Sequence, residues 1–248
     1  MGIFEAIWVD LQILFRPALF NLYFAFASIP VGFVLAIGLA LAKASRHKAV
    51  SRLASGYIYV FRGSPLFIQF FMIYSSVLAL NLSVWKPLGL DGLVLNPLVL
   101  GPVVLALNTT AYTAEILYGA LLSVPKGEVE AARAFGFGPA ARFRRIIWPH
   151  MIRLAWPAYT NEVVFLFHAT TLVYFTLPVI DDQKDLMNKA GELYQHDYNV
   201  LLHYSVAGLY FLAASLSVFF VFGLVYRHLT RHMAGATPLR FRFGNLLR

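Results

Sequence analysis

The residues of this chain that could do chemistry are a few polar side chains set inside long apolar runs. Between residues 97 and 122, Asn108, Tyr112 and Glu115 recur at i, i+4 and i+7, which places them on one face of a helix. Further along, Glu162 stands in another apolar run. A charged side chain at the centre of a bilayer costs roughly 2.5–3.5 kcal/mol, so such residues usually face a cavity or a partner. The pattern predicts a polar pocket or path inside a membrane.

The spacing of these residues does not fit an enzyme. The sequence has no Gly-x-Ser-x-Gly, no His-Glu-x-x-His and no pair of aspartates inside an apolar run. His168 has no second metal ligand at helical spacing, and a pairing of His196 with His203, seven residues on, is what chance would give. There is no cysteine, which excludes a thiolate metal site. We therefore predict no catalytic residue and no metal site.

The composition identifies the bilayer as the solvent of the fold. Of 248 residues, 59% are hydrophobic and only 13% are charged, against about 25% charged in a soluble domain. A soluble fold could not cover so much apolar surface with so little charge. The net charge of +8 does not indicate nucleic-acid binding, because the positive residues lie in short clusters between apolar runs. The sequence predicts an all-α membrane protein.

Five apolar stretches are long enough, at about 20 residues, to span a bilayer as helices. The second is interrupted near its start by the run Gly63-Ser64-Pro65. Neither a long linker nor an internal repeat divides the chain, so we expect a single transmembrane domain over residues 1–248. The five stretches run approximately over residues 17–42, 57–80, 97–122, 154–178 and 200–226.

Basic and acidic segments alternate between these stretches. Lys and Arg are concentrated after the first and third stretches and in the C-terminal tail. The loop before the fifth stretch is acidic instead. Because cytoplasmic loops carry the excess of Lys and Arg, we expect the N-terminus outside and the C-terminus in the cytoplasm. The acidic residues of that loop are Asp181, Asp182, Asp185, Glu192 and Asp197.

The segment between the third and fourth stretches carries the most specific motif. Residues 130–136 read Glu-Ala-Ala-Arg-Ala-Phe-Gly, and Ile146 and Pro149 follow. Apolar periodicity predicts a short helix that ends at Gly136 and a second helix that begins near Pro139. On periodicity alone, an interfacial helix that only anchors the loop is an equal alternative.

These residues resemble the EAA loop of ABC importer permeases, which reads Glu-Ala-Ala, three residues, Gly, nine residues and Ile-x-Leu-Pro. Trp148 stands where Leu is usual. In that family the loop is the coupling helix that docks in a cleft of the ATPase subunit. The chain has no Gly-x4-Gly-Lys-Ser/Thr pattern, so the resemblance implies that it holds no cofactor and that partner subunits bind ATP. The residues to which the resemblance gives the coupling role are Glu130, Ala131, Ala132 and Gly136.

Three further motifs resemble the polar amino acid permeases of that family. They begin at Phe61 (Phe-Arg-Gly-Ser-Pro-Leu), Leu107 (Leu-Asn-Thr-Thr-Ala-Tyr) and Pro157 (Pro-Ala-Tyr-Thr-Asn-Glu-Val). Together the motifs are most similar to the histidine/lysine-arginine-ornithine and opine permease subunits. The resemblance spans about residues 52–228. It implies the type I ABC importer architecture, with two similar membrane subunits, two ATPases and a periplasmic solute-binding protein.

The polar residues inside the apolar runs, taken together with the amino acid substrate that the resemblance implies, lead to a hypothesis for substrate binding. Glu162 would face its ammonium or guanidinium group, while Asn108 and Thr109 would hydrogen-bond its carboxylate. Alternatively, Glu162 would pair with Arg62 or with a basic loop residue. The residues expected to bind substrate are Asn108, Thr109, Tyr112, Glu162 and His168.

One position departs from the family pattern. Many members continue the fourth helix with Lys-Asp-Thr-Ser-Leu, where this chain has His168-Ala169-Thr170-Thr171-Leu172. Ala169 replaces an aspartate that could face a cationic substrate. Either this subunit is the non-binding half of a heterodimer, or its substrate is less cationic.

The sequence thus predicts the non-catalytic permease subunit of an ATP-driven importer in a bacterial inner membrane. We expect a heterodimer that carries a polar, cationic amino acid or an opine into the cytoplasm. One alternative is an importer of a neutral or acidic polar amino acid. Another is a secondary transporter, although that class usually shows inverted repeats with broken helices in both halves.

Overall fold

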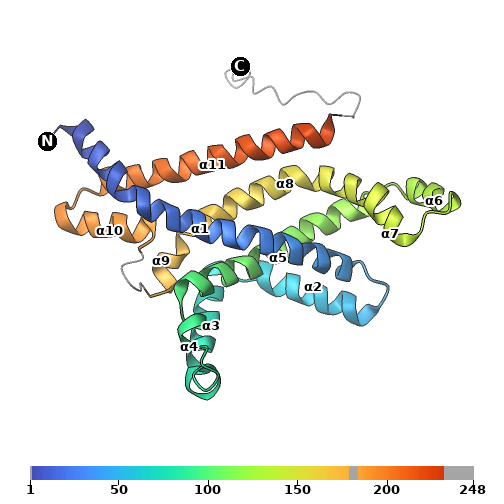
Figure 1. Cartoon of the computed structure of the whole chain (residues 1–248), viewed down its shortest axis with the longest axis horizontal. Helices are drawn as coiled ribbons and strands as arrows, with labels where there is room; N and C mark the ends of the chain where they lie inside the picture. The colour runs from blue at the N-terminus through green and yellow to red at the C-terminus, as the bar shows by residue number, and fades with distance from the viewer. Residues whose placement is uncertain (1, 179–183, 232–248) are drawn as a thin grey trace.

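Long helices form the body of the molecule. The computed structural model describes residues 2–178 and 184–231, and every regular element in these ranges is helical. Figure 1 shows the longest helices running along the long axis of the molecule, with α2 (Lys48–Gly63) beside α1 and α5. These longest helices are α1 (Ile3–Lys43), α5 (Pro97–Leu122), α8 (Trp148–Ala169) and α11 (Val200–Thr230).

α5 is the central helix, and its closest neighbour is α1. Gly32, Ala36 and Ala40 are buried on α1 at a spacing of four residues, which allows two helices to approach closely. A Cβ atom added at Gly32 would lie only 2.3 Å from Cγ2 of Thr109 on α5. The α1–α5 contact therefore depends on the absence of a side chain at Gly32.

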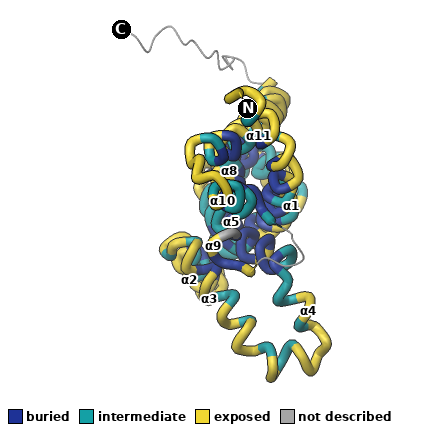
Figure 2. Tube along the Cα trace, turned by 90° about the vertical axis from the view of Figure 1, so that its left-hand side faces the viewer, coloured by how far each residue is buried: buried dark blue, intermediate teal, exposed yellow. Residues whose placement is uncertain are grey.

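The buried residues lie along the middle of the bundle (Figure 2), and many of the exposed residues are large and apolar. On α1, Phe26 and Val34 are 70% and 66% exposed, and on α11 Leu201 and Phe220 are 80% and 69% exposed. Among the described residues, α1, α5 and α11 are long and apolar enough to cross a membrane. Contact with lipid explains this exposure, because proteins surrounded by water rarely expose apolar surface of this extent.

The second predicted span is broken into two helices. α2 ends at Gly63, and α3 (Leu66–Ala79) starts after Pro65, which has no backbone N–H to continue the helix. α3 leads through the π-helical turn η1 (Asn81–Trp85) to the short helix α4 (Asp91–Val94). Figures 1 and 2 show this segment projecting from the bundle.

At the end of the bundle where α1 begins, the helices differ from those expected from the sequence. α1 begins at Ile3 rather than near Pro17, and α8 ends at Ala169. The short helix α9 (Leu172–Thr176) follows α8. Much of the expected acidic loop is the helix α10 (Leu186–Asp197), which packs on α1 and α11. Asp181 and Asp182 of that loop, and the tail beyond residue 231, lie outside the described residues.

Candidate solute-binding and coupling sites

Glu162 and Thr109 meet between α5 and α8. Thr109 Oγ1 donates a hydrogen bond of 3.0 Å to Glu162 Oε1. Only 3% of Thr109 and 8% of Glu162 is exposed. Within the described part of the chain, every ion pair joins residues other than Glu162. The structure thus holds a buried carboxylate with one hydroxyl donor and no bonded cation.

Asn108 points to a different neighbour. Its Nδ2 donates to Oε1 of Gln69 on α3 at 3.0 Å. Gln69 in turn donates through Nε2 to the carbonyl oxygens of Phe61 at 2.7 Å and Ser64 at 3.0 Å. Asn108 and Gln69 therefore complete the backbone hydrogen bonding at the break between α2 and α3. Gln69 was not among the predicted site residues, although its place four residues after Pro65 was a usable signal.

Tyr112 lines a separate cavity of about 460 Å³ between α1, α2 and α5. Lys43 Nζ lies 2.5 Å from Glu115 Oε2, and Arg62 lies 3.9 Å from the same oxygen. The Arg62 guanidinium also lies over the Tyr112 ring, 5.3 Å from its centroid. Arg62 is therefore within ion-pair distance of Glu115. The alternative considered from the sequence was an ion pair between Arg62 and Glu162. The polar residues around this cavity are Lys43, Ser55, Tyr59, Arg62, Tyr112 and Glu115.

His168 does not join the other predicted residues. Its Nε2 lies 2.9 Å from Ser215 Oγ on α11, and its ring packs edge-on against Phe211 of the same helix. The side chain faces the α8–α11 side of the bundle and is exposed there. The structure thus brings together Thr109 and Glu162. Asn108 contacts α3, Tyr112 lines the cavity beside α2, and His168 contacts α11.

The loop between α5 and α8 forms the expected short helix and turn. α6 (Lys126–Ala134) is followed by Gly136 at a φ of 79°, a left-handed conformation that favours glycine. The backbone N–H of Phe137 then donates to the carbonyl of Ala132 at 3.0 Å and closes the helix end. α7 (Pro139–Arg142) begins at the expected proline and continues through the π-helical turn η2 (Phe143–Ile147) into α8.

α6 presents most of its surface to the outside. Ala132 is buried, whereas Glu130 and Ala131 are exposed. Figure 1 shows α6 and α7 protruding at the end of the bundle opposite α10. The continuous run from α7 through η2 into α8 connects this protruding helix to the helix that carries Glu162. α6 joins α7 through the turn at residues 135–138 and packs against α7 and η2, so a force applied to α6 would reach α8 through these contacts and the helical run beyond the turn.

A helical bundle with apolar flanks indicates a membrane protein, and a carboxylate buried inside it indicates a polar interior. Comparison with known proteins gives the family. Residues 14–235 match the family described as the binding-protein-dependent transport system inner membrane component, and the chain belongs to it.

Relatives and solved structures agree with this family. The chain is 37% identical over 192 residues to the nopaline transport system permease protein NocM of Agrobacterium fabrum, covering 77% of each chain. It is 33% identical over 229 residues to the histidine/lysine/arginine/ornithine transport system permease protein HisM of Salmonella typhimurium, covering 92% of this chain and 94% of HisM. A crystal structure of an amino acid ABC transporter with histidines shares the fold, with a TM-score of 0.73, 24% identity and coverage of 92% and 99%.

Proposed function

We propose that this chain is a permease subunit of an ATP-driven importer that moves a cationic amino acid or an opine from the periplasm to the cytoplasm. The family membership and the two relatives support the class of transporter and the class of solute. A secondary transporter is not favoured, because the matched family is that of binding-protein-dependent systems. An importer of neutral or acidic amino acids is also not favoured, since the relatives are named for cationic amino acids and opines.

The buried carboxylate of Glu162 is the observation that carries the choice of a cationic solute. Among the described residues Glu162 is hydrogen-bonded to a hydroxyl but to no cation; a buried carboxylate without a counter-charge is costly, and a solute cation would supply that charge. Glu162 is the only acidic residue of α8, and Ala169 stands at the position where the family pattern described above often has Asp. Thr109 holds the Glu162 side chain, and we propose Asn108, Tyr112 and His168 only as more distant residues of the path.

The arrangement in the membrane follows from charge and from the ends of the helices. α1 begins beside α10, while α11 ends toward the end of the bundle that carries α6 (Figure 1). Arg and Lys are frequent near α6, which favours that end as cytoplasmic. We place the N-terminus outside and the C-terminus in the cytoplasm. The whole chain would form one domain with five crossings, the second of them through α2 and α3.

The exposed surface of α6 is the proposed contact with the ATPase. Small Ala side chains let a helix lie deep in a partner's groove, and the exposed Glu130 carboxylate can fix its register. The remaining coupling residues are Ala132, which packs inward, and Gly136, which turns the chain. ATP would be bound by the partner subunits, and closure of that pair would move α6 together with α7 and α8.

Three kinds of partner complete the proposed transporter. Two ATP-binding subunits would dock on the α6 side of two permease subunits. The second permease would be a similar but different chain. The relatives are named for the same solutes as the two-subunit permeases that the sequence resembles, and this supports a heterodimer. A periplasmic solute-binding protein would dock at the opposite end, where α10 lies.

Uptake by cells that carry the complete operon tests this function. Radiolabelled arginine, histidine, octopine and glutamine would be offered separately to cells with and without this subunit. We expect one or more of the cationic solutes or the opine to enter only when the subunit is present. Uptake of glutamine alone would overturn the proposed solute class. Equal uptake of every solute with and without the subunit would overturn the proposed role in import.

A further inference from the structure

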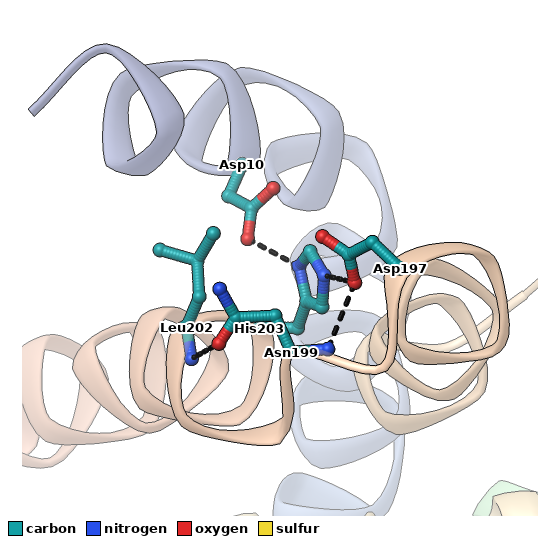
Figure 3. Close-up of polar contacts among 5 residues, drawn as sticks. All are labelled: Asp10, Asp197, Asn199, Leu202 and His203. Atoms are coloured by element: carbon teal, nitrogen blue, oxygen red, sulfur yellow. Dashed lines mark hydrogen bonds and ion pairs between the residues drawn. The ribbon is translucent and has the colours of Figure 1, made fainter. Parts of the chain in front are cut away.

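A buried histidine connects three helices at the α10 end of the bundle. His203, in the first turn of α11, lies between Asp10 of α1 and Asp197, the last residue of α10 (Figure 3). His203 Nδ1 is 2.6 Å from Asp10 Oδ2, and His203 Nε2 is 2.8 Å from Asp197 Oδ1. Asp10 and His203 are each 4% exposed, so water cannot readily replace either partner.

With both carboxylates ionised, the geometry requires a doubly protonated imidazole ring. An ionised carboxylate only accepts hydrogen bonds, and a neutral histidine has one N–H and one lone pair. With a carboxylate oxygen against each ring nitrogen, both bonds form only if both nitrogens carry protons. Loss of the proton would leave a nitrogen lone pair against a carboxylate, and two carboxylates with no cation between them. The charge of His203 therefore decides whether the cluster attracts or repels.

The local backbone is folded to bring Asp197 back to His203. Tyr198 takes the left-handed conformation, with a φ of 59°. Asn199 then caps α11 by accepting from the backbone N–H of Leu202 at 3.2 Å. Asp197 Oδ1 accepts from the backbone N–H of Asn199 at 3.0 Å, in addition to its contact with His203. The backbone N–H of Asn199, followed by His203, keeps the pKa of Asp197 below its usual range.

The other titratable groups of the packed helices have separate partners or lie outside the cluster. On α1, Glu5 bonds to the backbone of Gly2. On α10, Lys189 pairs with Glu192, while His196 is exposed. On α11, the Tyr210 hydroxyl donates to the Leu11 carbonyl of α1. Among the described residues, Asp10 and Asp197 are thus the charged groups that bond to His203.

We propose that Asp10, His203 and Asp197 form a proton-dependent clamp that holds α10 against α1 and α11, and that opens as the external pH rises. The effect on transport rests on the proposed function, in which α10 lies at the periplasmic end and helps to receive the binding protein. The clamp is closed while His203 carries its proton and the two carboxylates are ionised. Above the titration midpoint of His203, the ratio of closed to open forms falls by up to about tenfold per pH unit, because one proton is linked to closure.

The separation of α1 and α10 can be measured directly in the assembled transporter. The chain has no native cysteine, so spin labels can be attached at Gln12→Cys and Gln195→Cys, both exposed positions. Distances between the labels would be recorded in lipid nanodiscs at about pH 6 and about pH 9, a range that covers histidine titration. The partner subunits would carry no cysteine. We expect one narrow distance at the lower pH and a longer or broader distribution at the higher pH.

Two histidine variants make this measurement specific. His203→Gln cannot titrate, so its distance distribution should be the same at both pH values. His196→Gln alters the exposed neighbouring histidine and should keep the wild-type pH dependence. A wild-type distribution that does not change with pH would overturn the clamp, as would a His203→Gln variant that responds as wild type does.

Uptake measured over the same pH range tests the consequence for transport. We expect the ratio of uptake at about pH 6 to uptake at about pH 9 to be several times larger in wild type than in His203→Gln. Equal ratios, combined with a pH-dependent label distance, would contradict the link to transport but keep the clamp. A transporter without any uptake would contradict the proposed function, whereas the label distances would still test the clamp.

Discussion

Thr109 contacts two helices through two different atoms of one side chain. Its hydroxyl donates to the buried carboxylate of Glu162 on α8 at 3.0 Å. Its methyl group occupies the space that a side chain at position 32 of α1 would need. The orientation of Glu162 and the spacing of α1 from α5 are therefore set at the same residue.

The charge of Glu162 should be needed for uptake of the solute. Glu162→Gln keeps an oxygen that can accept from Thr109 but removes the negative charge. A hydrogen bond to a charged group contributes about 1.5–3 kcal/mol, so we expect uptake of a cationic solute to fall by roughly tenfold to a hundredfold. Subunit assembly and basal ATP hydrolysis should stay unchanged and serve as controls. Unaltered uptake by Glu162→Gln would contradict the proposed role of Glu162 in binding the solute.

A side chain at position 32 should destabilise the bundle through its contact with Thr109. Gly32→Ala places a Cβ atom 2.3 Å from Thr109 Cγ2, and overpacking of this kind costs about 1–3 kcal/mol. Thr109→Ser removes that methyl group and keeps the hydroxyl that bonds to Glu162. The double variant should therefore regain most of the thermal stability of the purified transporter. Failure of Thr109→Ser to rescue Gly32→Ala would show that another contact is responsible.

Removal of the Gln69 amide should weaken the junction of α2 and α3. Gln69→Met keeps the length of the side chain but leaves the carbonyls of Phe61 and Ser64 and the amide of Asn108 without this partner. Each buried polar group that loses its partner costs about 1–3 kcal/mol. We expect a lower unfolding temperature for Gln69→Met. The exposed apolar change Met72→Leu on the same helix should have little effect, and equal stability of Gln69→Met and wild type would contradict the assignment.

Asp185 should make the stability of α10 depend on pH. Burial raises the pKa of this N-cap residue to about 6, above the usual value for aspartate of about 3.9. Because the folded state holds the proton more tightly, the contribution to stability is greatest below about pH 4 and is lost as the pH rises through about 6. Asp185→Asn keeps a cap for the backbone N–H of Asn188 without a charge, and should remove this dependence.

Asp185→Ala is the companion variant for α10. It removes the cap as well as the charge, and loss of an N-cap costs about 1 kcal/mol. Near pH 7 we expect Asp185→Asn to be at least as stable as wild type and Asp185→Ala to be less stable than Asp185→Asn. Thermal unfolding of the purified transporter across pH measures both. An Asp185→Asn variant that is less stable than wild type near pH 7 would show that the buried charge itself stabilises the helix.

The sequence predicted the parts of the fold that depend on local signals. Apolar length located α5 at Pro97–Leu122, and the glycine and proline of the EAA loop marked the end of α6 and the start of α7. The start of α1 at Ile3 could not be obtained in this way. Its first turns carry Glu5 and Asp10, and hydropathy treats these residues as the end of an apolar run. The contact of Asp10 with His203, 193 residues away, compensates the aspartate and exists only in the folded chain.

The candidate site was predicted only in part, for a similar reason. Helical spacing placed Asn108 and Thr109 correctly on α5, but spacing within one helix does not say which neighbour each side chain meets. Asn108 meets Gln69 because the chain breaks at Pro65, and His168 meets Ser215 because α11 packs beside α8. These partners depend on tertiary packing, so a single sequence without contacts between helices cannot supply them.

Charge reversal on α6 tests the central claim most directly. Glu130→Lys and the control Glu128→Lys both alter an exposed glutamate of the same helix, and the two positions face in nearly opposite directions around it. Uptake of the identified solute would be measured in cells that carry the complete operon with each variant. The account predicts that Glu130→Lys abolishes uptake while Glu128→Lys retains most of it. Persistent uptake with Glu130→Lys would contradict the coupling of α6 to a partner ATPase.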